Sequence, residues 1–197
     1  FKSILGKIQN FSKKNNSKIL DIGSNDGSFL NLIKNKYSNI LGIEPTNSAD
    51  IAINRGIEII KRSLNFYLAK KIVNKYSKFD FIVATNILAQ TNNLDEILKS
   101  IKLLLNKKGL LIIEVQYLYD LLDQKGFDSF HHEHIQYYTF SSIIKVLENY
   151  SLYVFDAERL SVHGGMIRVY VASSKTVFSK RLKKILKKEN DKKILNK

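Results

Sequence analysis

Cysteine is absent from this sequence of 197 residues, and proline and methionine each occur once, as Pro45 and Met166. The absence of cysteine excludes disulfide bonds, zinc sites with cysteine ligands and mechanisms that use a cysteine nucleophile. It is also compatible with a reducing compartment, and we expect a cytoplasmic location. No apolar run approaches the roughly 20 residues of a membrane-spanning helix, so we expect no membrane span.

The sequence also lacks an initiator methionine and a recognisable signal peptide. We therefore expect it to be a fragment or a processed piece of a longer chain. Targeting sequences can be missing from such a piece.

Positive charge is in large excess, with 32 Lys and Arg residues against 18 Asp and Glu and a net charge of +14. An excess of this size often indicates nucleic-acid binding. Here, however, residues 175–197 alone contain ten Lys or Arg against Glu189 and Asp191. Most of the cations are Lys rather than Arg, in a sequence equally rich in Asn and Ile, which is typical of drift in composition. We therefore expect neither nucleic acid nor a membrane as a partner.

Hydrophobic residues make up 44% of the chain, which is enough for one globular domain with a core. Short runs of β-branched and aliphatic residues alternate with amphipathic segments, which predicts strands that alternate with helices. The expected strands cover residues 18–22, 39–43, 57–60, 79–84 and 110–115. The expected helices cover residues 2–14, 27–36, 47–55, 64–76 and 94–105. Continuous apolar strands are typical of an α/β fold with a mostly parallel sheet and helices on both faces.

The pattern changes in residues 117–140, which are rich in Tyr, Phe, Asp and His and show little periodicity. The last expected elements are a helix at 141–150, strands at 152–157 and 166–172, and a basic amphipathic helix at about 176–188. We expect residues 1–173 to form one domain. Residues 174–197 are then a basic helix that links this domain to a missing C-terminal region.

A glycine turn joins the first expected strand to the helix that follows it. Gly23 and Gly27 allow positive φ angles and let a ligand approach the backbone. The turn lies at the carboxyl edge of the sheet, where open α/β folds bind ligands. It lacks the G-x-G-x-x-G spacing of dinucleotide sites, and Asp21 and Asp26 flank it. Acidic side chains disfavour a pyrophosphate and favour a cationic ligand such as S-adenosylmethionine (SAM), whose amino group Asp21 can bind.

A second acidic residue, Glu44, ends the next strand, 23 residues after Asp21, and can accept hydrogen bonds from both ribose hydroxyls. Asn86 and Ile87 follow the fourth strand, where we expect them to face the methionine part of the cofactor. Any one of these features alone is explained as well by turn glycines and a surface carboxylate, but together they favour SAM over NAD. The expected cofactor-binding residues are Asp21, Gly23, Ser24, Asn25, Gly27, Glu44, Asn86 and Ile87.

All four histidines lie beyond residue 130. Three occur in the stretch HHEH at residues 131–134, and the fourth, His163, precedes two glycines. Histidine titrates near neutral pH and suits proton abstraction, and clustered titratable side chains usually mark a functional site. Two other interpretations stay open: a metal held by His132 and His134, or a polar loop without a function.

Several stretches resemble the bacterial sugar C-methyltransferases, which build branched deoxysugars and have the class I SAM-methyltransferase fold. The resemblance covers about residues 15–172. The matching stretches are DIGSNDGSFL (21–30), LGIEP (41–45), ATNILA (84–89), FDSFHHEHIQYY (127–138) and VFDAERLSVHGGMIRVYV (154–171). The last two are specific to this family, while the first indicates a methyltransferase in general.

The resemblance implies a nucleotide-linked 4-keto-6-deoxysugar as the substrate and SAM as the methyl donor. A proton is removed from the carbon next to the ketone, and the resulting enolate attacks the methyl carbon of SAM. By position, the implied catalytic residues are His134, Glu133 and His131. The expected substrate-binding residues are His132, His163, Gly164 and Arg168, together with Tyr117, whose ring can stack on a sugar.

The sequence departs from the family pattern at three positions. His131 stands where the family usually has Tyr, Gln90 where a His is common and Gln116 where a Pro is frequent. Family members also have a cysteine-rich zinc module before this domain and an α/β region after it. Because this chain has no cysteine, we expect a fragment or a minimal homologue without the zinc module, and no bound metal.

Two alternatives to C-methylation stay open. The first is another small-molecule O- or N-methyltransferase, in which His131 or His134 supplies the base. The second is a non-catalytic SAM-binding fragment whose basic tail binds nucleic acid or a membrane surface. Methylation of nucleobase amino groups or of cytosine C5 is not expected, because the sequence has neither an Asn/Asp-Pro-Pro-Tyr motif nor a cysteine. The sequence leaves the oligomeric state open.

Overall fold

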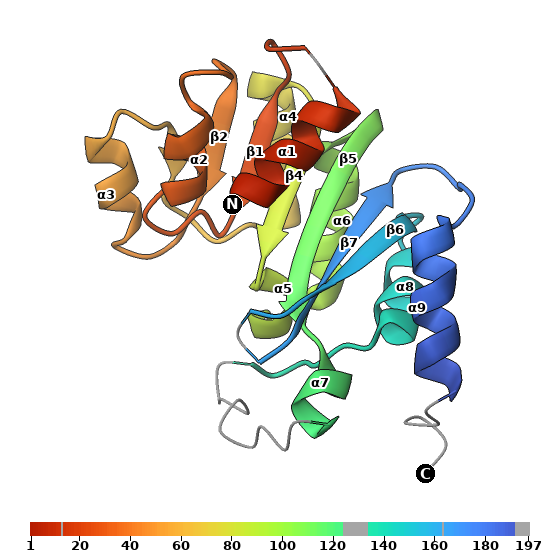
Figure 1. Cartoon of the computed structure of the whole chain (residues 1–197). Helices are drawn as coiled ribbons and strands as arrows, with labels where there is room; N and C mark the ends of the chain where they lie inside the picture. The colour runs from red at the N-terminus through yellow and green to blue at the C-terminus, as the bar shows by residue number, and fades with distance from the viewer. Residues whose placement is uncertain (13, 124–133, 163, 192–197) are drawn as a thin grey trace.

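The computed structural model describes residues 1–12, 14–123, 134–162 and 164–191. These residues form a seven-stranded sheet with the strand order β3-β2-β1-β4-β5-β7-β6 (Figure 1). The strands are β1 (Ile19–Ile22), β2 (Ile40–Ile43), β3 (Ile59–Ile60), β4 (Phe79–Thr85), β5 (Leu105–Gln116), β6 (Tyr153–Leu160) and β7 (Met166–Ala172). Strands β1 to β5 are parallel to one another, and β7 runs antiparallel to both β5 and β6.

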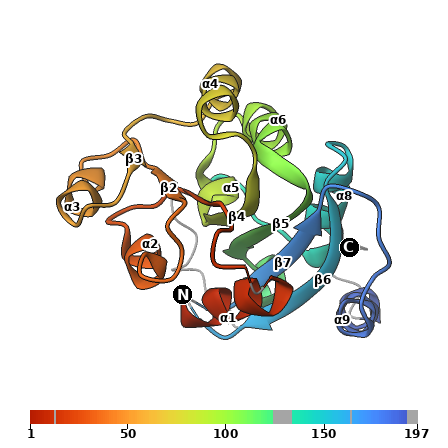
Figure 2. The ribbon, with the colours of Figure 1, turned by 90° about the horizontal axis from the view of Figure 1, so that it is seen from above.

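Helices cover both faces of this sheet. They are α1 (Lys2–Phe11), α2 (Ser28–Ile33), α3 (Ala49–Asn54), α4 (Phe66–Tyr76), α5 (Ile87–Gln90), α6 (Leu94–Leu104), α7 (Leu118–Asp123), α8 (Phe140–Glu148) and α9 (Lys180–Asp191). Helices α1 and α2 pack on one face, and α4, α6 and α8 pack on the other (Figure 2). The expected α/β fold, with a mostly parallel sheet and helices on both faces, is therefore confirmed.

Strand β1 shows how the two cores are built and what interrupts one of them. All four of its residues are buried, and their side chains alternate between the two faces. Ile19 joins the core under α1 and α2, whereas Leu20 and Ile22 join the core under α4 and α6. Asp21 is the exception, because it places a carboxylate at the carboxyl end of an otherwise apolar strand. An ionisable group in such a position indicates a functional site.

Two elements differ from those that the sequence predicts. Residues 105–109 were expected to end a helix and form a turn, but β5 already begins at Leu105, which pairs with Phe79. A register shift in this pairing takes up the extra residues before Leu110. The short helix α7 was not predicted at all, because six residues are too few to show a helical period. Its Tyr119 and Leu121 are buried, so tertiary packing stabilises it.

Helix α9, which lies in the expected basic helix, packs against β6 and α8. Leu182 is fully buried in the core shared with α8. Arg181 forms ion pairs with Asp156 and Glu158 of β6. The helix starts at Lys180, a few residues later than predicted, because the Ser179 hydroxyl accepts a hydrogen bond from the Leu182 N–H at 3.0 Å.

Within the part of the chain that the structure describes, no helix is both long enough and apolar enough to cross a membrane.

Candidate cofactor and acceptor sites

The turn after β1 depends on its two glycines. Gly23 and Gly27 have φ angles of +72° and +73°, in the left-handed region that side chains disfavour. A Cβ at Gly27 would lie 2.6 Å from the Cβ of Ala52, so a side chain there is excluded by space as well. A Cβ at Gly23 would lie 2.1 Å from Cδ1 of Ile87. The turn therefore brings bare backbone close to the residues that follow β4.

Asp21 is almost completely buried beneath this turn, with 3% of its surface exposed. Burial, and then the negative charge of Glu44, raise the pKa of Asp21 to about 8. Among the described residues, no donor forms a hydrogen bond with its carboxylate. A cation placed beside Asp21 would favour the ionised carboxylate and so lower the pKa of Asp21 again.

Glu44 directly follows β2 and is held in a fixed orientation. Its Oε2 accepts a hydrogen bond from the Asn25 N–H at 3.0 Å, which ties the strand to the turn after β1. Its Oε1 accepts hydrogen bonds from the N–H and the hydroxyl of Thr46, at 2.9 and 2.7 Å. A carboxylate offers about four acceptor positions, so Glu44 keeps capacity for a ligand hydroxyl.

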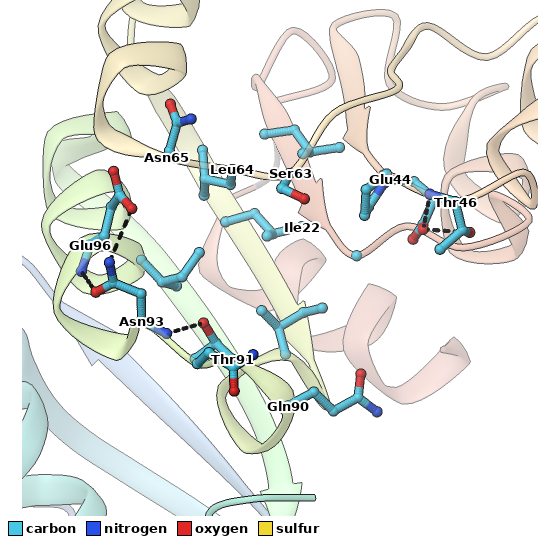
Figure 3. A pocket seen from close by; sticks show the side chains of 16 residues that line it. Ile22, Glu44, Thr46, Ser63, Leu64, Asn65, Gln90, Thr91, Asn93 and Glu96 are labelled. Carbon is cyan, nitrogen blue, oxygen red and sulfur yellow. Dashed lines mark hydrogen bonds between the residues drawn. The ribbon is translucent and has the colours of Figure 1, made fainter. Parts of the chain in front are cut away.

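A cavity of about 540 Å³ lies beside Glu44 at the carboxyl ends of β1 and β2 (Figure 3). Ile22 and Leu64 supply apolar walls, with Glu44 and Thr46 on one side and Asn93 and Glu96 on the other. The remaining lining residues are Gly23, Ile43, Pro45, Ser63, Asn65, Ile87, Gln90, Thr91, Asn92 and Ile97. Apolar walls with a few polar groups suit a flat heterocycle attached to a sugar.

These groups fit SAM. The cavity accommodates a nucleoside, Glu44 can accept from ribose hydroxyls, and Asp21 and Glu44 together supply the negative charge that a sulfonium and an ammonium group need. The Ser24 hydroxyl is buried with no partner among the described residues, which leaves one more polar group available at the turn. Asn86, with a φ of +62°, follows β4, and its N–H donates to the Glu114 carbonyl at 2.8 Å.

A second cavity, of about 580 Å³, lies at the carboxyl ends of β4 and β5. It is lined by Phe1, Ser3, Thr85, Asn86, Glu114, Arg159, Leu160, Ser161, Val162, Met166 and Arg168. Asn86 lines this cavity and Ile87 lines the first, so consecutive residues at the end of β4 line the two cavities.

The predicted substrate residue Arg168 lines this second cavity, but its guanidinium is held by protein groups. Its Nε donates to Oε1 of Glu114 at 2.5 Å, and one terminal nitrogen contacts the Ser3 hydroxyl at 2.7 Å and Glu158 at 3.3 Å. Its side chain is only 5% exposed. Arg168 therefore shapes the floor of the cavity.

Arg159 was missed by the sequence analysis of the substrate side, although it lies within a quoted motif. Its side chain is 53% exposed and lines the second cavity. Its Nε donates to Asp120 at 2.6 Å, and the Asp120 side chain is almost fully buried. Gly165 packs directly against this carboxylate, since a Cβ there would lie 2.3 Å from Oδ2 of Asp120. No sequence signal links Asp120 to Arg159, because 39 residues separate them.

His134 lies at the end of β5, where its Nδ1 is 2.7 Å from Oε1 of Gln116. The amide oxygen can only accept, so this contact places the proton on Nδ1 and the basic lone pair of the neutral ring on Nε2. The next two residues anchor the segment, because the N–H groups of Ile135 and Gln136 donate to the Ala89 carbonyl at 2.9 and 3.2 Å.

The other predicted site residues are placed as follows. Tyr117 is buried, and its hydroxyl donates to Oε2 of Glu189 at 2.9 Å. Gly164 has a φ of +74° in the loop between β6 and β7. The predicted residues His131, His132, Glu133 and His163 lie outside the described residues. Within the described part of the chain, no group of three or more His, Cys, Asp or Glu side chains is arranged to hold a metal ion.

The sequence matches the family described as a methyltransferase domain over residues 1–156. It is 30% identical over 155 residues to the C-methyltransferase NovU of Streptomyces niveus, a stretch that covers 78% of this chain and 37% of NovU. The chain thus spans well under half the length of that relative.

Solved structures with the same fold include a SAM-dependent methyltransferase from Clostridium acetobutylicum. Its TM-score is 0.65 at 15% identity, with 87% of this chain and 89% of that chain covered. The magnesium protoporphyrin IX methyltransferase of Synechocystis PCC 6803, solved with bound SAH, has a TM-score of 0.64 at 13% identity, with 86% and 79% covered. At these identities the similarity concerns the fold.

Proposed function

The chain belongs to the methyltransferase domain family, with the class I fold and SAM as methyl donor, and from this premise we propose that it methylates carbon. The proposed acceptor is a nucleotide-linked 4-keto-6-deoxysugar, methylated at the carbon next to the ketone. The observation that carries the proposal is the position of His134, whose Nδ1 is bound by Gln116 so that Nε2 is the basic atom. The relative NovU, named a C-methyltransferase, supports the choice of carbon over oxygen or nitrogen.

The second cavity supplies the kind of surroundings that a sugar ring needs. Leu160, Val162 and Met166 give it apolar walls, while Asn86 and Arg159 offer hydrogen-bond donors. A donor near the ketone oxygen stabilises the oxyanion that develops when the adjacent carbon loses its proton. Direct methyl transfer requires the acceptor to lie beside the cofactor, and the consecutive residues Asn86 and Ile87, which line the two cavities, support this arrangement.

In the proposed reaction, Asp21 and Glu44 hold the cofactor, which supplies an electrophilic methyl group when bound. His134 Nε2 accepts the proton from the carbon next to the ketone, and the C–H electron pair forms the enolate. The enolate carbon then forms a bond to the methyl carbon as the S–CH₃ bond breaks, so that the sulfur keeps the electron pair and S-adenosylhomocysteine leaves. The proton on His134 is then released to water, which restores the base.

The proposal is tested with SAM and a nucleotide-linked 4-keto-6-deoxysugar, by measuring the mass of the sugar product. We expect a gain of one methyl group, and exchange of the α-proton in heavy water when the cofactor is replaced by S-adenosylhomocysteine. O- or N-methylation requires no such exchange, so methylation without exchange favours that alternative. No methylation of any such sugar contradicts the proposal.

His134→Asn is the sharpest variant. Its side-chain amide keeps a donor for Gln116 but has no basic nitrogen, so we expect turnover and exchange to be lost while SAM still binds. His134→Gln is a second test variant, because it also lacks a basic nitrogen but places its amide differently, and it should lose turnover as well. Turnover retained by both variants excludes His134 as the base.

A further inference from the structure

Glu189, on the last helix of the described chain, is buried and accepts four hydrogen bonds. Its Oε1 accepts from the N–H and the hydroxyl of Ser141, at 2.9 and 2.5 Å. Its Oε2 accepts from the N–H of Phe140 and the hydroxyl of Tyr117, both at 2.9 Å. Only 4% of the residue is exposed. The carboxylate thus caps the N-terminus of α8 and at the same time holds the residue that follows β5.

The cap alone does not explain this arrangement. Helix α8 already has a capping box, in which the Thr139 hydroxyl accepts from the Ser142 N–H and the Ser142 hydroxyl accepts from the Thr139 N–H. A carboxylate at a helix N-terminus adds a favourable interaction with the helix dipole. The contact with Tyr117, however, lies outside α8 and connects α9 to the end of β5.

Tyr117 connects three parts of the candidate site: the loop between β6 and β7, the segment before α8, and the end of β5. Its N–H donates to the Gly165 carbonyl at 3.1 Å, in the loop between β6 and β7. It forms an isolated parallel bridge with Tyr138, and the N–H of Leu118 donates to the Tyr138 carbonyl at 2.9 Å. The preceding residue in the chain is Gln116, whose side chain binds His134.

The C-terminal end of the segment that carries His134 is held by Tyr138, the residue that bridges to Tyr117. The Tyr138 hydroxyl contacts Oε1 of Gln136 at 2.5 Å and the Leu88 carbonyl at 3.3 Å. Displacement of Tyr117 therefore moves Gln116 and the backbone partner of Tyr138 together. Both movements would change the position of the His134 ring, which Gln116 holds.

We propose that Glu189 is a positioning residue for His134, acting through Tyr117, so that helix α9 is part of the catalytic unit. This inference rests on the proposed role of His134 as the base. A carboxylate is required because only an ionised, acceptor-only group satisfies four donors at once. Glutamine at this position would turn its amide N–H groups toward those donors.

The test measures turnover, SAM binding and the state of the His134 ring in Glu189→Gln and Tyr117→Phe. Because small displacements of a catalytic group are costly, we expect kcat to fall by about tenfold or more, with the Kd of SAM changed by less than about twofold. We also expect the kcat effects to be non-additive in the double variant, because both changes break one contact. In ¹⁵N spectra of the His134 imidazole, each variant should shift the Nδ1 signal away from that of the hydrogen-bonded tautomer.

Ser141→Ala is the matched control. It removes one hydrogen bond to Glu189 on the α8 side and leaves the Tyr117 contact in place. We expect it to lower the thermal midpoint while kcat and the His134 signals stay as in the natural chain. If Ser141→Ala lowers kcat as much as Tyr117→Phe does, Glu189 has only a structural role and the proposal is overturned.

The imidazole spectra separate this inference from the proposed function, because they need no acceptor. If the protein methylates no ketosugar but the Nδ1 signal still shifts in Glu189→Gln and Tyr117→Phe, the proposed function fails and the positioning role stands. If the signal is unchanged in both variants while methylation proceeds normally, the positioning role fails and the proposed function stands.

Discussion

Replacement of Asp21 by Asn is expected to abolish most of the pH dependence of SAM binding. In the protein, burial and the charge of Glu44 raise the pKa of Asp21 from 3.8 to about 8. Below that pH the carboxyl is mainly protonated, whereas a cationic ligand binds its ionised form. As the pH rises toward 8, ionisation of Asp21 should therefore lower the Kd of SAM, and above that pH Asp21 contributes no further change.

The size of the effect follows from the distance between the working pH and this pKa. Each pH unit below 8 costs about 1.4 kcal/mol of binding free energy, which is about tenfold in Kd. Between pH 8 and pH 6 the titration of Asp21 should thus weaken SAM binding by about 50-fold, because half of the carboxyl is already protonated at pH 8. At pH 7 about nine-tenths of a proton is released per SAM bound, because that fraction of Asp21 is protonated beforehand.

Calorimetry in two buffers with different ionisation enthalpies measures this proton release directly. The α-amino group of the ligand titrates near pH 8 as well, so Asp21→Asn is needed as the reference that retains only the ligand's own titration. We expect the variant to bind SAM more weakly and to release almost no proton at pH 7. The reasoning is refuted if the natural protein releases no proton at pH 7, or if the variant keeps the same pH slope.

Two further predictions concern the stability of the frame around the sites. Gly27→Ala should lower the free energy of unfolding by about 2–3 kcal/mol in urea titrations, because it adds a steric conflict to a left-handed φ. Gly56→Ala, with a φ of +74° and open space around it, should cost only about 1 kcal/mol. Equal losses in the two variants would exclude the steric contribution at Gly27. Arg168→Met should cost about 3–5 kcal/mol, because it leaves the largely buried Glu114 without its ion-pair partner, whereas Glu158 keeps Arg181; a loss below about 1 kcal/mol would show that the pair with Glu114 contributes little.

The cofactor half of the site was predictable from the sequence because its residues lie next to strand ends. Asp21, Gly23 and Gly27 surround one turn, and Glu44 directly follows the neighbouring parallel strand, so strand order alone brings them together. The alternation of apolar strands with amphipathic helices is an equally local pattern, and it predicted the α/β class. The sequence could not show that Asp21 has no hydrogen-bond donor among the described residues, because this depends on which side chains surround it.

The acceptor half was only partly predictable. Its motif at residues 154–171 pointed to Arg168, yet the structure assigns that guanidinium to Glu114 and leaves the neighbouring Arg159 exposed in the cavity. The two arginines have the same chemistry, and their sequence positions do not distinguish them. Their partners do, because Glu114 pairs with Arg168 across β5 and β7, while Asp120 is brought to Arg159 by a helix that the sequence did not predict.

The sequence by itself determined the cofactor class and the α/β fold class, because both follow from glycines, carboxylates and apolar runs at fixed local spacings. Only the tertiary structure decided what surrounds the predicted base. Gln116 binds His134, Tyr117 stands beside it, and Glu189 comes from more than 70 residues away to hold Tyr117. These contacts join segments whose separation along the chain carries no pattern, since they depend on how helix α9 packs against the end of the sheet.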